Sequence, residues 1–317
     1  MSQITIIGLG LIGTSLGLAL KREEHDYIIV GHDKDSKAVQ RARRMGAIDK
    51  SHWNLIAACE HADLILLAIP TAGIAPTLEA ICDDLKPGCL IMDTAAIKRP
   101  VMKAAEVLPD NVHFVGGNPI LARGAGLSAD DASADLFEGA SWALCAAPTT
   151  APDAIRVSAD LVAAVGAQPL FLDADEHDGL VAAVDGLPTI LAAALMRATA
   201  QSPAWREIRR LAGGQYESLT YLPDFEPADL TAAVQANSVN IIHWLDTLIG
   251  ELGAWKEALQ SENGDALNQG FEKAIDARAQ WLKKRARGDW EERDRPEDAP
   301  SFWRSLFGFR APPSGKK

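Results

Sequence analysis

Three glycines near the start of the chain have the spacing of a loop that binds the pyrophosphate of a dinucleotide. Gly8, Gly10 and Gly13 lie between an apolar strand-like stretch, 4–7, and an apolar helix-like stretch, 14–20. In such a loop the first glycine allows a tight turn, the second lets the pyrophosphate approach, and the third lets the helix pack closely. The helix N-terminus then faces the phosphates with free N–H groups. The predicted dinucleotide contacts here are Gly8, Leu9, Gly10, Leu11, Ile12 and Gly13.

An acidic residue follows at the distance expected for a ribose ligand. Asp33 comes directly after a second apolar stretch, 27–32. A carboxylate there accepts hydrogen bonds from the ribose hydroxyls of NAD and repels the 2′-phosphate of NADP, although Lys34 and Lys37 could soften that preference. We therefore expect NAD as the cofactor, with NADP possible; the alternative is a glycine-rich turn without a ligand. Further cofactor contacts are expected at Ile69, Pro70 and Thr71.

The elements that must position these residues alternate between strand and helix in the first half of the chain. Apolar runs at 62–69, 88–93, 112–116, 142–145 and 169–172 have the continuous pattern of parallel strands that are covered on both faces. An amphipathic helix is expected over residues 36–45. The fold class is therefore α/β, with an N-terminal doubly wound Rossmann-type domain and a ligand crevice at the carboxyl ends of its strands.

The second half is predicted to be an all-α domain. Helical periodicity covers residues 176–200, 204–213, 228–260 and 264–287. Residues 240–249 are apolar on more than one face, which favours burial between neighbouring helices or in a dimer interface. The expected domains are a dinucleotide-binding domain over 1–172, a helical substrate and dimerisation domain over 173–286, and a disordered charged linker with a short aromatic tail over 287–317.

The tail gathers five large apolar residues within residues 301–310, SFWRSLFGFR. One interpretation is that it folds back onto its own domain. The other is that it docks to a partner or to a membrane surface.

Composition excludes several classes of function. The 317 residues suffice for two cores, and the net charge of −12 argues against nucleic acid or an anionic membrane as the main partner. No apolar run reaches the ~18–20 residues of a membrane span, and we expect no signal peptide. The four cysteines lack metal-ligand or disulfide spacing, so we expect no metal and a reducing, cytoplasmic location. They are Cys59, Cys82, Cys89 and Cys145.

Seven segments carry a more specific signal. They are GLGLIGTSLGLALK (8–21), LILLAIPTAGIAPTLEAI (64–81), LKPGCLIMDTAAIK (85–98), FVGGNPILARGAG (114–126), DLFEGASWALCAAP (135–148), HDGLVAAVDGLP (177–188) and AGGQYESLT (212–220). In order and spacing they resemble the prephenate/arogenate dehydrogenase family of tyrosine biosynthesis, over roughly residues 3–285. The resemblance implies an NAD-dependent homodimer that oxidises a cyclohexadienyl carboxylic acid. Hydride leaves the ring carbon C4, CO₂ is lost and the ring becomes aromatic.

The resemblance also implies a histidine that takes the proton of the 4-hydroxyl, and an arginine that clamps a carboxylate. The histidine position is Asn118 here, in the segment 116–120. An asparagine can hold a hydroxyl by hydrogen bonding, but it cannot accept its proton. The arginine position falls in Thr220-Tyr221, so that arginine is absent, unless Arg197, Arg206 or Arg210 replaces it.

Other substrate-facing positions depart from the family pattern as well. Ala96 stands where the family has a serine, and Gly124 stands where it has an acidic residue. The segment 185–189 lacks both family histidines. Several changes together imply that the substrate site has been rebuilt or abandoned.

The remaining catalytic candidates each have a structural alternative. Arg123, in a loop on the expected substrate side, could bind a carboxylate; the alternative is a surface arginine or one that contacts adenine or phosphate. Lys98 could bind substrate, or it could be a solvated lysine in the first turn of a helix. With Asn118, these are the predicted catalytic residues.

Three histidines and two aspartates have mainly structural interpretations. Asp178 is expected to cap the first long helix of the second domain, and His177 beside it to be structural more than catalytic. His113 is expected to be satisfied within a strand, and His243 to be a buried packing residue. Asp93 ends a strand near the cofactor crevice and is expected to orient a loop.

Three hypotheses follow. The first is a prephenate- or arogenate-type dehydrogenase with a remodelled site. The second is an NAD-dependent oxidoreductase of another small acid, with Arg123 or Lys98 as the anion clamp. The third is a non-catalytic dinucleotide-binding protein that acts through partners.

Overall fold

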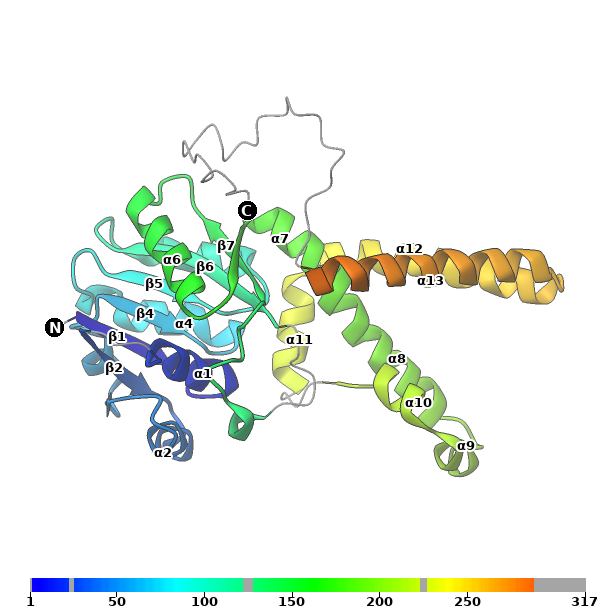
Figure 1. Cartoon of the computed structure of the whole chain (residues 1–317), viewed down its shortest axis with the longest axis horizontal. Coiled ribbons are helices and arrows are strands. Elements are labelled where there is room, and N and C mark those ends of the chain that lie inside the picture. The colour runs from blue at the N-terminus through cyan, green and yellow to red at the C-terminus, as the bar shows by residue number, and fades with distance from the viewer. Residues whose placement is uncertain (1, 23–25, 122–127, 223–226, 288–317) are drawn as a thin grey trace, which may run out of the picture. The chain divides into compact units, whose positions relative to one another are not determined.

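The computed structural model describes residues 2–22, 26–121, 128–222 and 227–287 (Figure 1). By its contacts the chain divides into two compact units, Met1–Ile249 and Gly250–Lys317, which are taken separately below. Arg123, Gly124 and the tail 301–310 lie outside the described residues.

The first unit contains one sheet of eight strands in the order β3-β2-β1-β4-β5-β6-β7-β8. The strands are β1 (Ser2–Ile7), β2 (Tyr27–His32), β3 (Lys50–Ser51), β4 (Leu64–Leu67), β5 (Leu90–Asp93), β6 (His113–Ile120), β7 (Ser141–Ala146) and β8 (Gln168–Phe171). The first six have the order of a dinucleotide-binding sheet. The predicted Rossmann-type fold is therefore confirmed.

The direction of β7 corrects the prediction. The apolar run 142–145 was expected to be a parallel strand like its neighbours, but β7 pairs antiparallel with β6, and β8 pairs parallel with β7. A parallel return requires a crossover of a dozen or more residues, usually a helix. The described part of the β6–β7 connection, residues 128–140, holds only a 3₁₀ turn at Ala129–Asp131.

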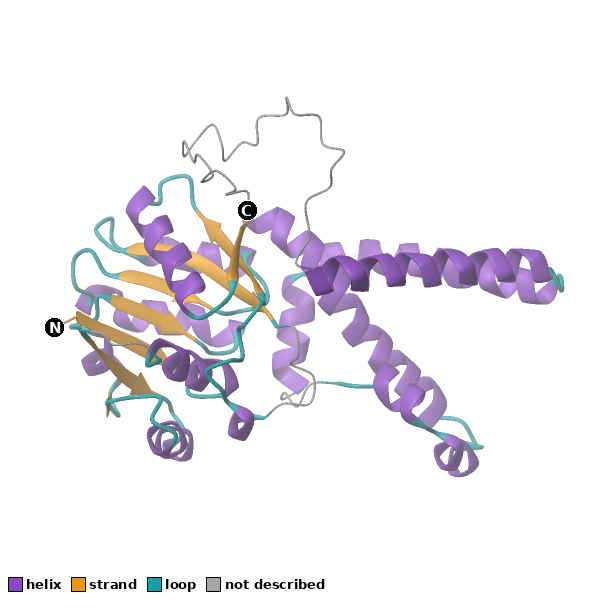
Figure 2. Cartoon of the chain, in the orientation of Figure 1, coloured by secondary structure: helices purple, strands orange, loops and turns teal. Residues whose placement is uncertain are grey.

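Helices cover both faces of the sheet, which explains the continuous apolar strands (Figure 2). Side chains of α1, α2 and α6 join one core cluster, and those of α3, α4 and α5 join the other. The bounds are α1 (Leu11–Leu20), α2 (Ser36–Arg44), α3 (Leu55–Cys59), α4 (Thr71–Ile81), α5 (Arg99–Ala104) and α6 (Pro152–Ala164). Short 3₁₀ turns follow α4 (Cys82–Asp84) and α5 (Ala105–Val107).

From Asp173 onward every regular element that the structure describes is a helix, as predicted. They are α7 (Ala174–Val181), a π-helical turn (Ala182–Gly186), α8 (Leu187–Ala200), α9 (Trp205–Leu211), α10 (Gly214–Leu219), α11 (Pro227–Ala236), α12 (Ser238–Gln260) and α13 (Gly264–Arg287). The helix predicted over 228–260 is broken at Asn237. This residue is buried, and its side-chain Nδ2 donates to the carbonyl of Asp178 at 2.7 Å.

Helix α7, the π turn and α8 run on as one helical segment, Ala174–Ala200. By length and composition alone it could cross a membrane: an 18-residue stretch within it has a mean hydropathy of 1.8, and little of that stretch is buried. The expectation that no apolar run of this length is uninterrupted is not contradicted, because Asp185 lies within the apolar part. A core helix of a soluble protein passes this test of length and composition too.

Helix α12 exposes apolar residues in the single chain. Ile241 is buried, whereas Ile242 and Ile249 are 56% and 63% exposed. Of the two interpretations of this segment, burial between neighbouring helices of the same chain is wrong. The prediction that His243 is a buried packing residue is also wrong, because it is exposed.

In the second unit, the last turns of α12 pack against α13. The rings of Trp255 and Phe271 lie 4.7 Å apart. A Cβ on Gly270 would lie 2.9 Å from the Trp255 ring, so this glycine allows the two helices to approach.

Candidate functional site

The glycine turn between β1 and α1 has the geometry that its sequence predicts. Gly8 has a φ of +92°, and a Cβ on it would lie 2.2 Å from the carbonyl oxygen of Ala68. A Cβ on Gly13 would lie 1.8 Å from the Gly8 carbonyl oxygen, whereas nothing lies within 4 Å of a Cβ on Gly10. The space over Gly10 is open at the N-terminus of α1, where the first N–H groups lack helical partners. This cradle fits a pyrophosphate.

Asp33 is tied to the same turn. Its Oδ2 accepts from the Leu9 N–H at 2.7 Å and its Oδ1 accepts from the Asp35 N–H at 2.8 Å. These contacts fix the orientation of the carboxylate. Each of its oxygens can still accept a further hydrogen bond from a ligand. The half-buried side chain is thereby held beside the turn, as a ribose ligand would have to be.

Arg41 is a residue at this turn that the sequence analysis did not consider. From α2, its guanidinium donates to the Leu9 carbonyl at 3.3 Å, and its Nε lies 3.8 Å from the Asp130 carboxylate. That Nε is buried without a hydrogen-bond partner. An orphaned cationic donor beside the turn fits an anionic or aromatic part of a dinucleotide. Arg41 lies 32 residues from Leu9 in the sequence, so no local pattern indicates that the two residues are in contact.

The predicted residues after β4 lie against the turn. A Cβ on Gly8 would come within 2.8 Å of the Ile69 side chain. Pro70 and Thr71 follow at the start of α4, which comes directly after β4 at the carboxyl edge of the sheet. The structure thus brings both predicted groups of cofactor residues together.

Lys98 lies in a buried cluster beyond β5. Its ammonium contacts the Asp93 carboxylate and donates to the Gly117 carbonyl at 2.5 Å, and both charged side chains have 0% exposure. Asp93 also accepts from the N–H groups of Ala95 and Gly117, at 2.8 and 3.0 Å. The alternative of a solvated lysine is therefore wrong. Asp93 orients the loop after β5, as expected.

The two glycines before Asn118 make room for this cluster. A Cβ on Gly117 would lie 2.5 Å from the Asp93 carbonyl oxygen and 2.8 Å from Trp142 Nε1. A Cβ on Gly116 would lie 3.2 Å from Cδ of Lys98. The Gly-Gly-Asn sequence thus lets β6 run close to the buried Asp93–Lys98 pair.

Asp178 caps a different helix from the one expected. Its Oδ1 accepts from the Lys98 N–H at 2.6 Å and its Oδ2 accepts from the Arg99 N–H at 2.9 Å, so it caps α5. Helix α7 is capped by Asp173, whose carboxylate accepts from the Glu176 N–H at 2.7 Å. The sequence could not reveal this, because α5 and α7 are about 80 residues apart.

His177 joins Asp178 to Asn118. The His177 Nδ1 lies 2.9 Å from Asp178 Oδ1, and its Nε2 lies 3.1 Å from Asn118 Nδ2. A carboxylate only accepts, so Nδ1 carries a proton. In the neutral imidazole, Nε2 then accepts from the Asn118 amide. His177 is 1% exposed and Asn118 is 6% exposed.

These residues lie at the edge of the sheet that carries the glycine turn. Asn118 is near the end of β6, just beyond the point where β5 ends at Asp93. In open α/β sheets, ligands bind outside the carboxyl ends of the strands. The arrangement can therefore hold a dinucleotide over β1 and β4, and a second molecule near Asn118.

The other arginine candidates lie elsewhere. Arg197, Arg206 and Arg210 are all exposed, on α8 and α9. No contact joins them to Asn118. In the described parts of the chain, no group of three or more histidine, cysteine or acidic side chains could hold a metal ion.

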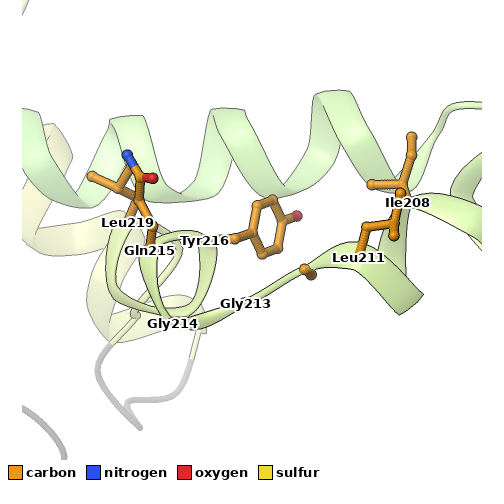
Figure 3. Close-up of a pocket in the computed structure, with 8 residues that line it drawn as sticks. Ile208, Leu211, Gly213, Gly214, Gln215, Tyr216 and Leu219 are labelled. Atoms are coloured by element: carbon orange, nitrogen blue, oxygen red, sulfur yellow. The ribbon is translucent and has the colours of Figure 1, made fainter.

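An open apolar pocket lies between α9 and α10 (Figure 3). Its lining includes Leu211, which is 87% exposed, and Tyr216, whose hydroxyl lies 2.6 Å from Thr199 Oγ1 in α8. The pocket holds none of the predicted site residues. Its apolar lining is typical of a surface that another chain covers.

Comparisons with known proteins agree on one family. A family model described as the prephenate dehydrogenase nucleotide-binding domain matches residues 16–170, and one described as its dimerization domain matches residues 173–273. The prephenate dehydrogenase of Bacillus subtilis is 28% identical over 279 residues, covering 87% of this chain and 75% of that protein. The probable prephenate dehydrogenase NovF of Streptomyces niveus is 31% identical over 271 residues, covering 82% and 69%.

The fold is shared with solved structures. Prephenate dehydrogenase from A. aeolicus, crystallised with hydroxyphenyl propionate and NAD⁺, has a TM-score of 0.81 and 21% identity. The match covers 88% of this chain and 98% of that chain.

Proposed function

Since this chain belongs to the prephenate dehydrogenase family, we propose that it is an NAD-dependent dehydrogenase that oxidatively decarboxylates a cyclohexadienyl acid of the prephenate or arogenate type. The observation that carries this proposal is the open cradle over Gly10, on the same edge of the sheet as Asn118. The first of the three hypotheses is thus the one we adopt.

The cofactor is NAD. The cradle of Gly8, Gly10 and Gly13 would hold its pyrophosphate, and Asp33 its ribose. NADP is the alternative cofactor, since the Arg41 guanidinium also lies at the turn. When bound, NAD⁺ takes up the hydrogen and two electrons of a substrate C–H bond. A relative with this fold was crystallised with NAD⁺, which supports the assignment.

The residues near the substrate have distinct proposed roles. Asn118 would contact the heteroatom on the oxidised ring carbon, in the place of the family's histidine. Lys98 would hold the loops around it, because its ammonium is buried and engaged. Arg123, outside the described residues, remains a prediction for carboxylate binding. The absence of the usual histidine and arginine from this site is likewise part of the proposal.

The working form would be a homodimer through the helical domain. The family model for residues 173–273 is a dimerization domain, and the exposed apolar faces of α8, α12 and the α9–α10 pocket fit burial against a second copy. We place the domain boundary at residues 172–173, between the two family matches. A cytoplasmic location remains a prediction that the unpaired cysteines support.

Two measurements test this proposal. Calorimetry should detect NAD⁺ binding, and absorbance should then detect NADH with prephenate, arogenate or a ring analogue of either. Failure to bind NAD⁺ or NADP⁺ would contradict the assignment of the glycine turn. Binding without turnover of any cyclohexadienyl acid would instead favour a non-catalytic protein.

A further inference from the structure

We propose that the substrate carries an amino group, instead of a hydroxyl group, on the ring carbon that is oxidised. This inference rests on the proposed function, because it concerns which cyclohexadienyl acid the same site takes. It follows from the hydrogen bonds that fix Asn118 and His177.

The histidine beside Asn118 is not free to act as a base. Its Nδ1–H donates to Asp178, and its Nε2 lone pair accepts from Asn118 Nδ2. Asp178 is fixed in turn by the N–H groups of Lys98 and Arg99. A base must reach its proton within hydrogen-bond distance, and His177 is 1% exposed.

The same hydrogen bond orients the Asn118 amide. One N–H of Nδ2 is used by His177, and Oδ1 has no hydrogen-bond partner among the described residues. In that part of the chain, only Arg41 Nε and Trp142 Nε1 are wholly buried side-chain polar atoms without a partner. Among the described residues, Asn118 Oδ1 is thus an unused acceptor that a ligand can engage.

None of the described side chains in the buried cluster around Asn118 can replace the missing base. Asp93, Lys98, His177 and Asp178 are each at most 1% exposed, and each is engaged in hydrogen bonds within the protein. The segment 121–127, LARGAGL, contains no histidine or carboxylate. The described residues of the site can thus accept a hydrogen bond at this point, but they cannot take a proton.

The chemistry of a hydroxyl substrate requires such a proton acceptor. As the C–H bond breaks, the oxygen becomes a strongly acidic protonated carbonyl, and removing its proton lowers the barrier. Loss of a general base typically costs about 10²- to 10⁴-fold in rate. A neutral amine does not have this requirement, because the iminium ion that it forms is a much weaker acid than a protonated carbonyl and keeps its protons until CO₂ leaves.

The amino reaction balances without a protein base once the substrate's ammonium group has lost one proton to the solvent. The ring C–H bond breaks and its electron pair leaves with the hydrogen to NAD⁺, which gives a C=NH₂⁺ iminium. The ring carbon–carboxylate bond then breaks, CO₂ leaves, and the bonding electrons neutralise the iminium as the ring becomes aromatic. The products are an aromatic amine, CO₂ and NADH. Asn118 Oδ1 accepts one N–H throughout.

The test compares prephenate with its 4-amino-4-deoxy counterpart, using the full-length wild-type protein and saturating NAD⁺. We expect kcat/KM to be about 100-fold higher for the amino compound, the lower end of the effect of a general base. A ratio of tenfold or less would overturn the inference and leave the proposed function intact. If neither compound is consumed although NAD⁺ binds, the inference is overturned, and the proposed function is overturned with it when arogenate is not consumed either.

A binding measurement tests the position of Asn118 without turnover. Calorimetry with NAD⁺ present would compare 3-(4-aminophenyl)propionate with unsubstituted 3-phenylpropionate. Asn118→Ala should weaken binding of the amino compound about 2- to 13-fold, the effect of one hydrogen bond, and leave the unsubstituted compound unchanged. Equal effects on both ligands would show that Asn118 does not contact the substrate nitrogen, and would overturn the inference.

A gain-of-function variant provides the complementary test. Asn118→His restores a base where prephenate needs one, so prephenate turnover should rise at least about tenfold relative to the wild type. If this variant folds and binds NAD⁺ but prephenate turnover does not rise, the missing base is not what limits the hydroxyl substrate, and the inference fails.

Discussion

The Asn118 amide donates to His177 Nε2 at 3.1 Å, and this contact links the end of β6 to the first helix of the helical region. His177 is in turn fixed by Asp178, which caps α5. One chain of hydrogen bonds thus orients the proposed substrate contact and holds the helix that follows Lys98. The orientation of Asn118 therefore depends on residues that do not themselves face the substrate.

Asp178→Asn should destabilise the protein and lower its activity. The carboxylate accepts from two backbone N–H groups and from His177, and an amide would direct its NH₂ at one of these donors. Because the site is fully buried, we expect a loss of about 1–3 kcal/mol in the free energy of unfolding. Denaturant unfolding measures it.

The matched control is Asp175→Asn, one turn earlier on the same helix. Asp175 forms an ion pair with Arg99 at 2.9 Å, but its side chain is exposed. Its replacement should change stability by less than ~0.5 kcal/mol. Equal effects of the two variants would contradict the assigned role of Asp178.

Gly10→Ala and Gly13→Ala should separate cofactor binding from folding. Gly10 has an ordinary φ of −75° and open space around it, so alanine should fold normally and raise the Kd for NAD⁺ at least about tenfold by obstructing the pyrophosphate. At Gly13 the new Cβ would overlap the Gly8 carbonyl, so the fold should lose about 1–3 kcal/mol. Calorimetry and thermal unfolding measure the two effects. Tight NAD⁺ binding by Gly10→Ala would argue against this cradle.

Only Cys82 should react with iodoacetamide in the native protein at pH 8. Burial raises the pKa of the Cys59, Cys89 and Cys145 thiols to about 12 each. Since the thiolate is the nucleophile, about one in 10⁴ of each is reactive at that pH. Cys82 is partly exposed at the end of α4. Peptide mapping should find all four labelled after denaturation, and early labelling of a buried cysteine would contradict the fold around it.

Asp63 should contribute stability that is lost in acid. Hydrogen bonds from Lys86 and from the Gln3 N–H lower the pKa of its carboxyl below the ordinary value. Because this pKa is lower in the folded protein than the unfolded value of about 3.9, the ionised carboxylate stabilises the fold at pH values above about 3.9. The stabilisation is lost as the pH falls through the pKa of the folded protein. The stability difference between wild type and Asp63→Asn should therefore shrink below about pH 4. Asp84→Asn, at an exposed site, is the control; an unchanged difference for Asp63→Asn would refute the assignment.

The sequence predicted those features whose signals are local. The glycine turn, the strands and the helical second half each follow from spacing or periodicity within about 20 residues. The direction of β7 was missed because strand direction depends on the path of the connection, not on the apolar pattern of the strand. The break at Asn237 was missed because it depends on a contact with Asp178.

The site was predicted less completely, because its contacts are distant in sequence. Nothing local indicates that Asp178 caps α5, that Lys98 is buried against Asp93, or that Arg41 reaches Leu9. The sequence showed that Asn118 stands in the place of the family's histidine, but it did not show which hydrogen bonds the asparagine makes. The structure adds the hydrogen bond to His177, which fixes the orientation of the amide.

The most direct test of the account is the stoichiometry of NADH and CO₂ formed from a cyclohexadienyl acid. With the 4-amino acid as substrate, the protein should release equal amounts of NADH, CO₂ and aromatic amine, all dependent on added NAD⁺. If NAD⁺ binds but neither the 4-amino nor the 4-hydroxy acid yields NADH and CO₂ together, the chain is not the decarboxylating dehydrogenase proposed here.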